Sequence, residues 1–208
     1  MRVRFHRFLL VLVACGCTPQ GDPGLPPQGF SDDFERKDLG DDWHNTGGGY
    51  SIRNGQLRVE GARNKPLWLR RTLPHDVRIQ FDAKSDSAEG DIKVEVFGDG
   101  VSKAEKASYT ATSYVVIFGG WKNTLNVLAR MDEHAENRVV GEAYKVVPGQ
   151  TYHMKIERRG ATITAWVDDR KLVAMTDPEP LAGPGHDHFG FNNWQAPLTF
   201  DNLRVNPL

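Results

Sequence analysis

The chain has only two cysteines in 208 residues, and both, Cys15 and Cys17, lie near its start. The rest of the chain therefore contains no disulfide and no cysteine metal site. An excess of charge of one sign is also missing, because 26 Lys and Arg stand against 27 Asp and Glu. Nucleic-acid binding requires clustered cations, so we do not expect a nucleic acid as a partner.

The apolar run near the start of the chain is too short to span a bilayer, which takes about 20 apolar residues. Three arginines precede an apolar run of residues 8–14, a pattern typical of a signal peptide over residues 1–14. The sequence Leu-Val-Ala-Cys at residues 12–15 resembles the bacterial lipobox, in which the cysteine is lipidated and becomes the first mature residue. We therefore expect an exported protein that is anchored to the cell-envelope membrane by a lipid at Cys15, on the periplasmic or the surface face. The alternatives are an ordinary secretory signal and acylation at Cys17, which fits the motif less well.

Residues 15–29 are expected to form a disordered tether, because residues 18–29 contain four prolines and three glycines. Residues 30–208 then form one domain of 179 residues, large enough for its own core. Loss of residues 1–14 removes three arginines and leaves 23 basic against 27 acidic residues, a formal charge of −4. We expect this mildly acidic domain to be a monomer.

Helical periodicity is absent, since no window of 11 or more residues carries a sustained apolar stripe. About twelve short segments alternate apolar and polar residues instead, with turns between them, which predicts an all-β sandwich of two antiparallel sheets. Residues 151–176 predict a three-stranded meander with reversals at Arg159-Gly160 and at Asp168–Arg170. Residues 114–118 are almost continuously apolar, which favours a central strand covered on both faces.

Four segments together resemble one family. Phe30-x-x-x-Phe34 is followed by Leu39-Gly40-x-x-Trp43, by Tyr50-Ser-Ile-x-Asn-Gly-x-Leu57 and, at the end, by Phe200-Asp-Asn-Leu-Arg-Val205. This arrangement is similar to the concanavalin A-like lectin/glucanase jelly roll, and more narrowly to bacterial laminin-G-like and 3-keto-disaccharide hydrolase-type domains. The resemblance implies a jelly-roll sandwich with paired terminal strands and a ligand site on the concave face of one sheet. It rests on fold-forming residues, so it implies much less about activity.

Asp91, Lys93 and Glu95 alternate along one expected strand. In this fold, family 16 glycoside hydrolases carry Glu-x-Asp-x-(x)-Glu on a concave strand, but here a lysine stands between the two carboxylates. Asp91 and Glu95 would lie about 13 Å apart along the strand, whereas retaining glycosidases need about 5–5.5 Å. We interpret the row as a self-neutralised surface face, and we expect no catalytic residue in it.

Two histidines, His186 and His188, are expected on one strand face about 6.6 Å apart. Three roles are open for them: hydrogen bonds within the turn that follows Pro184-Gly185, contact with a ligand, or a zinc site. A zinc site would need a third ligand, such as His44, His153 or a carboxylate.

Two asparagines and a tryptophan follow these histidines at residues 192–194. Sugars need polar partners for their hydroxyls and flat apolar partners for their C–H faces, which amides and indoles supply. We therefore expect a carbohydrate or glycan to contact His186, His188, Asn192, Asn193, Trp194 and Trp121. The other reading of these tryptophans is a place in the core, which we expect for Trp43 and Trp166.

The resemblance to laminin-G-like domains also implies a structural calcium near the paired ends of the chain, with Asp201 and Asn202 as oxygen ligands. Hydrogen bonds from these side chains to the adjacent backbone are the alternative. For the whole protein we expect non-catalytic binding of a glycan. The alternatives are a saccharide hydrolase of the 3-keto-disaccharide hydrolase type and a structural or protein-binding surface lipoprotein. The sequence does not name the ligand.

Overall fold

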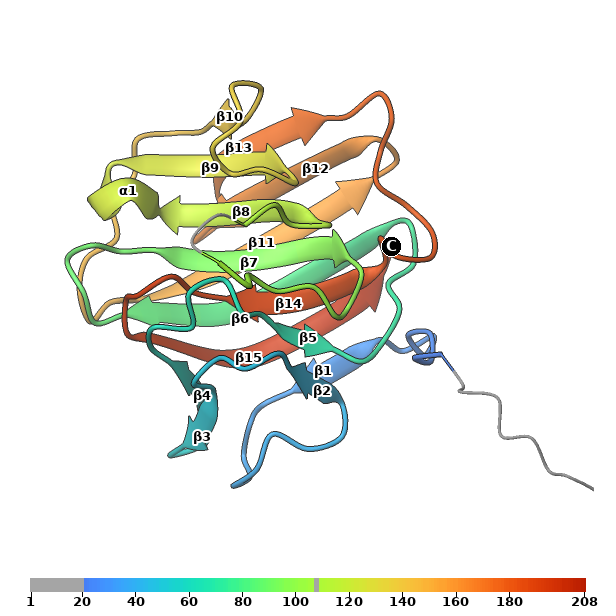
Figure 1. Cartoon of the computed structure of the whole chain (residues 1–208), viewed down its shortest axis with the longest axis horizontal. Coiled ribbons are helices and arrows are strands. Elements are labelled where there is room, and N and C mark those ends of the chain that lie inside the picture. Colours follow the sequence, from blue (N-terminus) through green and yellow to red (C-terminus); the bar gives the residue numbers. More distant parts are fainter. Residues whose placement is uncertain (1–20, 107–108) are drawn as a thin grey trace, which may run out of the picture.

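The computed structural model describes residues 21–106 and 109–208, so the predicted signal peptide and Cys15 lie outside the described residues. Within the described part, two antiparallel sheets pack face to face (Figure 1). The back sheet has the order β13-β12-β11-β6-β15-β4-β3, with β1 also paired to β15. The front sheet has the order β10-β9-β8-β7-β14-β5-β2. The jelly-roll sandwich predicted from the sequence is confirmed.

The strands of the back sheet are β1 (Phe30–Asp32), β3 (Ser51–Arg53), β4 (Gln56–Val59), β6 (Val77–Ser85), β11 (Thr151–Arg159), β12 (Thr162–Val167), β13 (Arg170–Thr176) and β15 (Leu198–Pro207). Those of the front sheet are β2 (Trp43–Asn45), β5 (Leu67–Leu69), β7 (Ile92–Gly98), β8 (Tyr114–Gly119), β9 (Leu125–Arg130), β10 (Val139–Val140) and β14 (His188–Asn192).

The turns form where the sequence predicts them. Asn54 and Gly55 both have positive φ, 53° and 69°, as a two-residue type I′ hairpin requires. Asp168 and Asp169 do the same at 49° and 62° and join β12 to β13. The meander β11-β12-β13 and the pairing of the terminal strands β1 and β15 are therefore both confirmed.

The core fills the space between the two sheets. Side chains that alternate inward from both sheets build it, with an aromatic centre formed by Phe34, Trp43, Phe81, Phe189, Phe191 and Phe200. Trp43 is 6% exposed, as expected of a core residue, and its indole N–H donates to Asp32 at 2.8 Å. Trp166 was wrongly predicted to be core. Ile163, Ala165 and Val167 point inward on β12, so the two-residue period turns Trp166 outward, where the Lys155 ammonium lies 4.8 Å from its ring.

The described part of the predicted tether, residues 21–29, lies against the sandwich. The Leu25 N–H donates to the Thr72 carbonyl at 3.2 Å, and the Thr72 N–H donates to the Pro23 carbonyl at 2.9 Å. Asp22 also forms an ion pair with Arg70 at 3.3 Å, and its second carboxylate oxygen lies 3.4 Å from a His188 ring nitrogen. The ordered domain therefore begins before Phe30, because the backbone there finds hydrogen-bond partners. Among the described residues, no helix is both long and apolar enough to cross a membrane.

Candidate functional site

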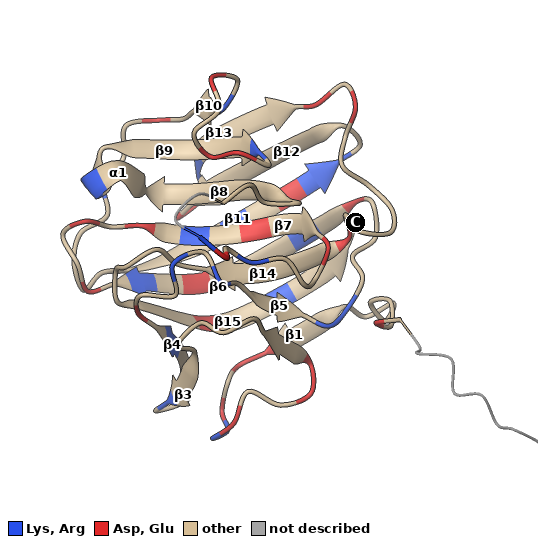
Figure 2. Ribbon diagram, viewed as in Figure 1, with Lys and Arg blue, Asp and Glu red and all other residues tan. Residues whose placement is uncertain are grey.

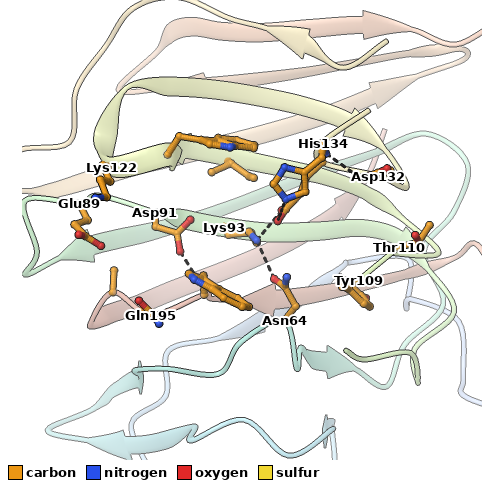
Figure 3. A pocket seen from close by; sticks show the side chains of 15 residues that line it. Asn64, Glu89, Asp91, Lys93, Tyr109, Thr110, Lys122, Asp132, His134 and Gln195 are labelled. Carbon is orange, nitrogen blue, oxygen red and sulfur yellow. Dashed lines mark hydrogen bonds and ion pairs between the residues drawn. The ribbon is translucent and has the colours of Figure 1, made fainter. Parts of the chain in front are cut away.

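A cavity of about 1160 Å³ lies on the outer face of the front sheet, over β7, β8 and the loop after β14 (Figure 3). Loops from distant parts of the chain surround it, so that charged and aromatic side chains meet there. Its lining comprises Asn64, Glu89, Asp91, Lys93, Tyr109, Thr110, Ile117, Trp121, Lys122, Asp132, Glu133, His134, Trp194, Gln195 and Ala196. A second, smaller cavity of about 280 Å³ lies beside β10 and β13.

The floor of the cavity is charged, because β7 carries residues of both signs in the middle of the sheet (Figure 2). Ile92, Val94 and Val96 point into the core, so Lys93 and Glu95 point outward. Both are nonetheless buried, at 2% and 0% exposure. The prediction of a surface row is therefore wrong, because loops that the strand pattern does not reveal cover this face of the sheet.

Lys93 is held between two loops (Figure 3). Its ammonium donates to the Asn64 side-chain oxygen at 2.8 Å and lies 2.7 Å from a Glu133 carboxylate oxygen. Asn64 precedes β5 and has a positive φ of 58°; its backbone N–H donates to the Asn193 carbonyl and its carbonyl accepts the Ala104 N–H. A buried ammonium needs such partners, since an unpaired charge is costly away from water. These contacts place the Lys93 ammonium at the cavity floor and fix its orientation.

Glu95 lies beneath this floor and accepts three hydrogen bonds. Its donors are the Ser113 hydroxyl at 2.6 Å, the Asn192 amide at 2.6 Å and the Tyr109 hydroxyl at 3.2 Å. Burial raises the pKa of Glu95 to about 7, although the three donors and the charge of Lys93 favour the carboxylate. Glu95 therefore changes charge near neutral pH. It does not line the cavity and is connected to it only through its hydrogen-bond partners.

Asp91 lies immediately before β7 with a positive φ of 64° and lines the cavity itself. One of its carboxylate oxygens accepts the Trp194 backbone N–H at 3.0 Å. Burial raises the pKa of Asp91 above its usual range, against the opposing effect of Lys93. A carboxylate with a raised pKa beside a cation is a common arrangement in acid–base catalysis.

Two tryptophans flank the cavity. Trp194 is 38% exposed, and its backbone is fixed by Asp91 on one side and by the Arg63 N–H on the other. Trp121 lies in the short segment α1 (Gly120–Asn123) between β8 and β9. This segment is a left-handed turn, because Trp121, Lys122 and Asn123 have φ of 50°, 58° and 61°. Non-glycine residues rarely adopt this conformation.

The left-handed turn is held by a neighbouring segment. The Asn123 side chain donates to the Val146 carbonyl at 2.7 Å and accepts the Val146 N–H at 2.9 Å. The Trp121 ring contacts the Arg138 guanidinium at 5.0 Å and the His134 ring at 5.5 Å. Hydrogen bonds thus hold the backbone near each tryptophan, and this places both indoles at the cavity.

Of the residues predicted to bind a ligand, Trp121 and Trp194 line this cavity and the others do not. Asn192 and Asn193 are both 0% exposed. Asn192 donates to Glu95 below the floor, whereas the Asn193 side chain bonds the Ala62 N–H at 2.9 Å and the Ala196 carbonyl at 2.6 Å. These two amides support the site and do not form its surface.

The two predicted histidines lie elsewhere. His188 is at the far end of β14 from Asn192, about 13 Å along the strand, and is 8% exposed. Its ring nitrogens lie 2.8 Å from Asp187 and 3.4 Å from Asp22. A His186 ring nitrogen lies 2.7 Å from the Thr112 carbonyl. The structure therefore places both histidines outside the cavity, His186 beside a backbone carbonyl and His188 between two carboxylates.

The residues predicted to bind calcium lie on the back sheet. Asn202 has a positive φ of 52° in a bulge of β15, and its amide donates to Asp82 at 2.9 Å. Asp201 accepts a hydrogen bond from Gln56 at 3.2 Å. No cluster of three or more His, Cys, Asp or Glu residues suited to a metal ion exists among residues 21–106 and 109–208. The calcium site remains a prediction from the sequence.

The sequence did not point to six of the residues in and beneath this cavity, namely Asn64, Asp91, Lys93, Glu95, Tyr109 and Glu133. One signal could have identified two of them, since charged side chains on a strand between apolar strands are rare unless they are paired. The assembled site can bind a polar ligand between two indoles, and it offers a carboxylate with a raised pKa and a fixed ammonium. These are the groups needed to remove a proton next to a carbonyl and to stabilise the resulting anion.

Comparison with known proteins agrees with this architecture. The family model described as the 3-keto-alpha-glucoside-1,2-lyase-like domain matches residues 29–206. The carbohydrate-binding module CBM66 from Bacillus subtilis is 18% identical, with a TM-score of 0.58 over 79% of this chain and 95% of that chain. The Bacillus licheniformis β-glucanase is 10% identical, with a TM-score of 0.61 over 87% and 99%. The laminarinase from Rhodothermus marinus is 15% identical, with a TM-score of 0.56 over 87% and 98%.

A search of curated protein sequences gives no significant match. The solved structures share the concanavalin A-like fold with this chain, and at these identities the likeness concerns the fold alone. The resemblance to this jelly roll, and to its 3-keto-disaccharide hydrolase-type branch, is confirmed.

Proposed function

The chain belongs to the family of 3-keto-alpha-glucoside-1,2-lyase-like domains, and we propose from this premise that its cavity binds a saccharide and eliminates the group at C1 of a 3-keto sugar. The observation that carries the proposal is the convergence of Asp91, Lys93 and Glu133 in one cavity between two indoles. This set of groups favours a catalytic site over the non-catalytic binding expected from the sequence, because its titratable side chains lie together in a concave site and one of them has a raised pKa.

The chemistry that the family name describes needs few catalytic groups. A ketone at C3 makes the hydrogen on C2 acidic, so a base removes that proton and an enolate forms at C2–C3. Its electron pair then forms the C1=C2 double bond and expels the glycosidic oxygen from C1, which takes up a proton from an acid. No water is consumed, and the products are an unsaturated keto sugar and an alcohol.

We assign the proton removal to Asp91, whose raised pKa makes it a stronger base than an exposed aspartate. Lys93 stabilises the enolate oxygen, since its ammonium is already oriented by Asn64 and Glu133. Tyr109 lines the same cavity and is the candidate hydrogen-bond donor to the leaving oxygen, because burial and the nearby Glu95 charge raise its pKa and keep its hydroxyl protonated. The proton that the leaving oxygen takes up is then the one that Asp91 has removed from C2. Trp121 and Trp194 offer flat faces to the sugar rings.

Non-catalytic binding of a glycan is the second candidate. It is favoured by the exposed Trp194 and by the charge of Lys93, which Glu133 already neutralises without a ligand. The likeness to CBM66, a carbohydrate-binding module, supports the same reading.

One pair of substrates separates the two candidates. The protein is incubated with p-nitrophenyl 3-keto-α-glucoside and, in parallel, with the unoxidised p-nitrophenyl α-glucoside, and nitrophenol release is followed by absorbance. Elimination requires the ketone, so we expect release from the keto sugar alone, and its loss in Asp91→Asn. Equal cleavage of both would indicate a hydrolase. Binding of both by calorimetry without cleavage would indicate a binding module, and neither binding nor cleavage would refute a saccharide site of this kind.

For the location of the protein, we propose export and lipid anchoring to the cell envelope at Cys15. The support is the lipobox-like sequence at residues 12–15 and the basic and apolar residues that precede it. Residues 22–25 lie beside Thr72, so the anchor would join the domain at the β5 side of the front sheet (Figure 1).

A further inference from the structure

Tyr109 links the cavity to the buried carboxyl of Glu95. The tyrosine ring lines the cavity and packs against an apolar cluster on the outer face of β8 and β9. Its hydroxyl donates to a Glu95 oxygen at 3.2 Å, and the Ser113 hydroxyl donates to the same oxygen at 2.6 Å. Asn192 donates to the other oxygen at 2.6 Å. The hydrogen bonds that the Tyr109 hydroxyl can offer to the cavity therefore depend on Glu95, which does not line the cavity itself.

The two oxygens of Glu95 are not equivalent. The Asn192 amide N–H can only donate, so its partner oxygen must remain an acceptor in every protonation state. The hydroxyls of Ser113 and Tyr109 can donate or accept, so a proton on Glu95 belongs on the oxygen that these two share. A neutral carboxyl O–H is a weaker acceptor than a carboxylate, because charge-assisted hydrogen bonds are roughly twice as strong as neutral ones.

We propose that Glu95 is a positioning residue that sets the direction of the Tyr109 hydroxyl proton. When Glu95 is ionised, the Tyr109 O–H donates to it and presents only lone pairs to the cavity. When Glu95 is neutral, the Tyr109 O–H is released to donate to a sugar oxygen. The functional meaning of this inference rests on the proposed saccharide site. The coupling of Glu95 to Tyr109 does not depend on that site.

The surroundings of Glu95 place its change of protonation state near neutral pH. Burial raises its pKa to about 7, while its three donors and the charge of Lys93 oppose that shift. Tyr109 stays protonated throughout, since burial and the Glu95 charge raise its own pKa. Tyr50, packed on the core side, is kept neutral in the same way and donates to the Phe191 carbonyl at 2.9 Å. Lys93, whose ammonium is held by Glu133 and Asn64, is the cation that opposes the shift of Glu95.

Two substitutions test the proposal. In Glu95→Gln the amide oxygen must accept from Asn192, which turns the amide N–H₂ toward Ser113 and Tyr109. The tyrosine oxygen then accepts, and its O–H is free for the cavity at every pH, so this variant imitates neutral Glu95. Tyr109→Phe removes the donor at every pH and keeps the ring.

The functional measurement is calorimetric binding of p-nitrophenyl α-glucoside, which the proposed reaction leaves intact, at pH 5.5 and pH 8.5. For the wild type we expect affinity to fall by about five- to tenfold at the higher pH, the worth of one neutral hydrogen bond. Glu95→Gln should keep the tighter affinity at both values, and Tyr109→Phe should show the weaker affinity at both. A pH dependence that persists in Glu95→Gln overturns the proposal.

A measurement without ligand separates this inference from the proposed function. In protein labelled with ¹³C at the tyrosine ring, the Tyr109 signal should shift with a midpoint near pH 7 in the wild type and stay constant in Glu95→Gln. Tyr114 is the internal control, because it donates to Asp177 at 2.7 Å, and hydrogen bonds hold the Asp177 pKa below its usual range against burial. If the saccharides fail to bind but the Tyr109 signal titrates, the proposed function is refuted and the coupling stands. If the signal does not titrate, the coupling is refuted whatever binds.

Discussion

Lys93 and Glu133 form an ion pair of 2.7 Å between the middle of β7 and the loop after β9, 40 positions apart in the chain. The two side chains differ in access to water, at 2% exposure for Lys93 and 15% for Glu133. This difference makes the pair asymmetric. Removing the carboxylate leaves a buried charge, whereas removing the ammonium leaves a carboxylate that water reaches.

We therefore expect Glu133→Ala to lower the free energy of unfolding by about 3 kcal/mol, the scale for a buried ion pair that has lost one partner. Lys93→Met, which keeps the length of the side chain, should cost clearly less. Urea unfolding of both variants measures the difference. Equal losses, or a stable Glu133→Ala protein, would mean that water reaches Lys93 in solution.

Trp194→Ala should weaken saccharide binding and leave the fold intact. The ring is 38% exposed, and its backbone contacts with Asp91 and Arg63 do not need the side chain. Loss of one stacking face costs on the order of 1–3 kcal/mol, or about 5- to 150-fold in affinity. Calorimetry gives the affinity and thermal unfolding gives the stability. Trp166→Ala, on the outer face of the back sheet, is the matched control and should bind normally.

Glu95 makes the stability of the domain depend on pH. Its folded-state pKa of about 7 is raised above the usual 4.5, so the folded state binds this proton more tightly than the unfolded state does. Stability from this group is complete below about pH 4.5 and is lost as the pH rises through 7, a decrease on the order of 3 kcal/mol. Urea unfolding at pH 5.5 and pH 8.5 should show much of this loss in the wild type and not in Glu95→Gln. If both proteins lose the same stability, another group is responsible.

Val167→Asp should prevent folding or cost several kcal/mol, because Val167 is 4% exposed between the sheets and a charge there finds no partner. Thr162→Asp is the control on the same strand. Thr162 points outward and pairs with Arg159 in the β11–β12 register, so its replacement should be tolerated. Circular dichroism and thermal unfolding compare the two. A Val167→Asp protein that melts cooperatively near the wild-type temperature would contradict the assigned strand faces.

Cys15→Ser should abolish acylation and leave a precursor that no longer partitions with detergent. Cys17→Ser tests the neighbouring cysteine and should be processed normally. Metabolic labelling with a fatty acid, followed by detergent phase separation, measures both. A labelled Cys15→Ser protein would assign the lipid to another residue.

Much of the fold could be predicted from local patterns. Asn54-Gly55 and Asp168-Asp169 predict tight hairpins because these residues tolerate positive φ, and the structure has both turns. The two-residue alternation on β12 predicts the inward faces of Ile163 and Val167. The same alternation turns Trp166 away from the core, because strand periodicity and not residue type decides which face a side chain takes.

The site was harder to predict because its parts meet only through long-range contacts. Asn64, Lys93, Glu133 and Asn192 lie on four segments, and each has an unremarkable local sequence. Strand periodicity states that Lys93 and Glu95 point away from the core, but it does not state whether a loop covers that face. For Trp194 and Trp121, the chemistry of an indole beside amides and glycines was enough to suggest a place in the site.

The class of fold and the turns follow from periodicity and turn chemistry in the sequence, and side-chain type pointed to two aromatic residues of the cavity, whereas the pairing of the chain ends was implied by the family resemblance. Only the tertiary structure decided that the charges of β7 are buried, that Glu95 has a raised pKa and that Asp91, Lys93 and Glu133 share one cavity. Burial and electrostatic coupling depend on which distant loops cover a strand. That is a property of the folded chain as a whole, and no local segment of the sequence encodes it.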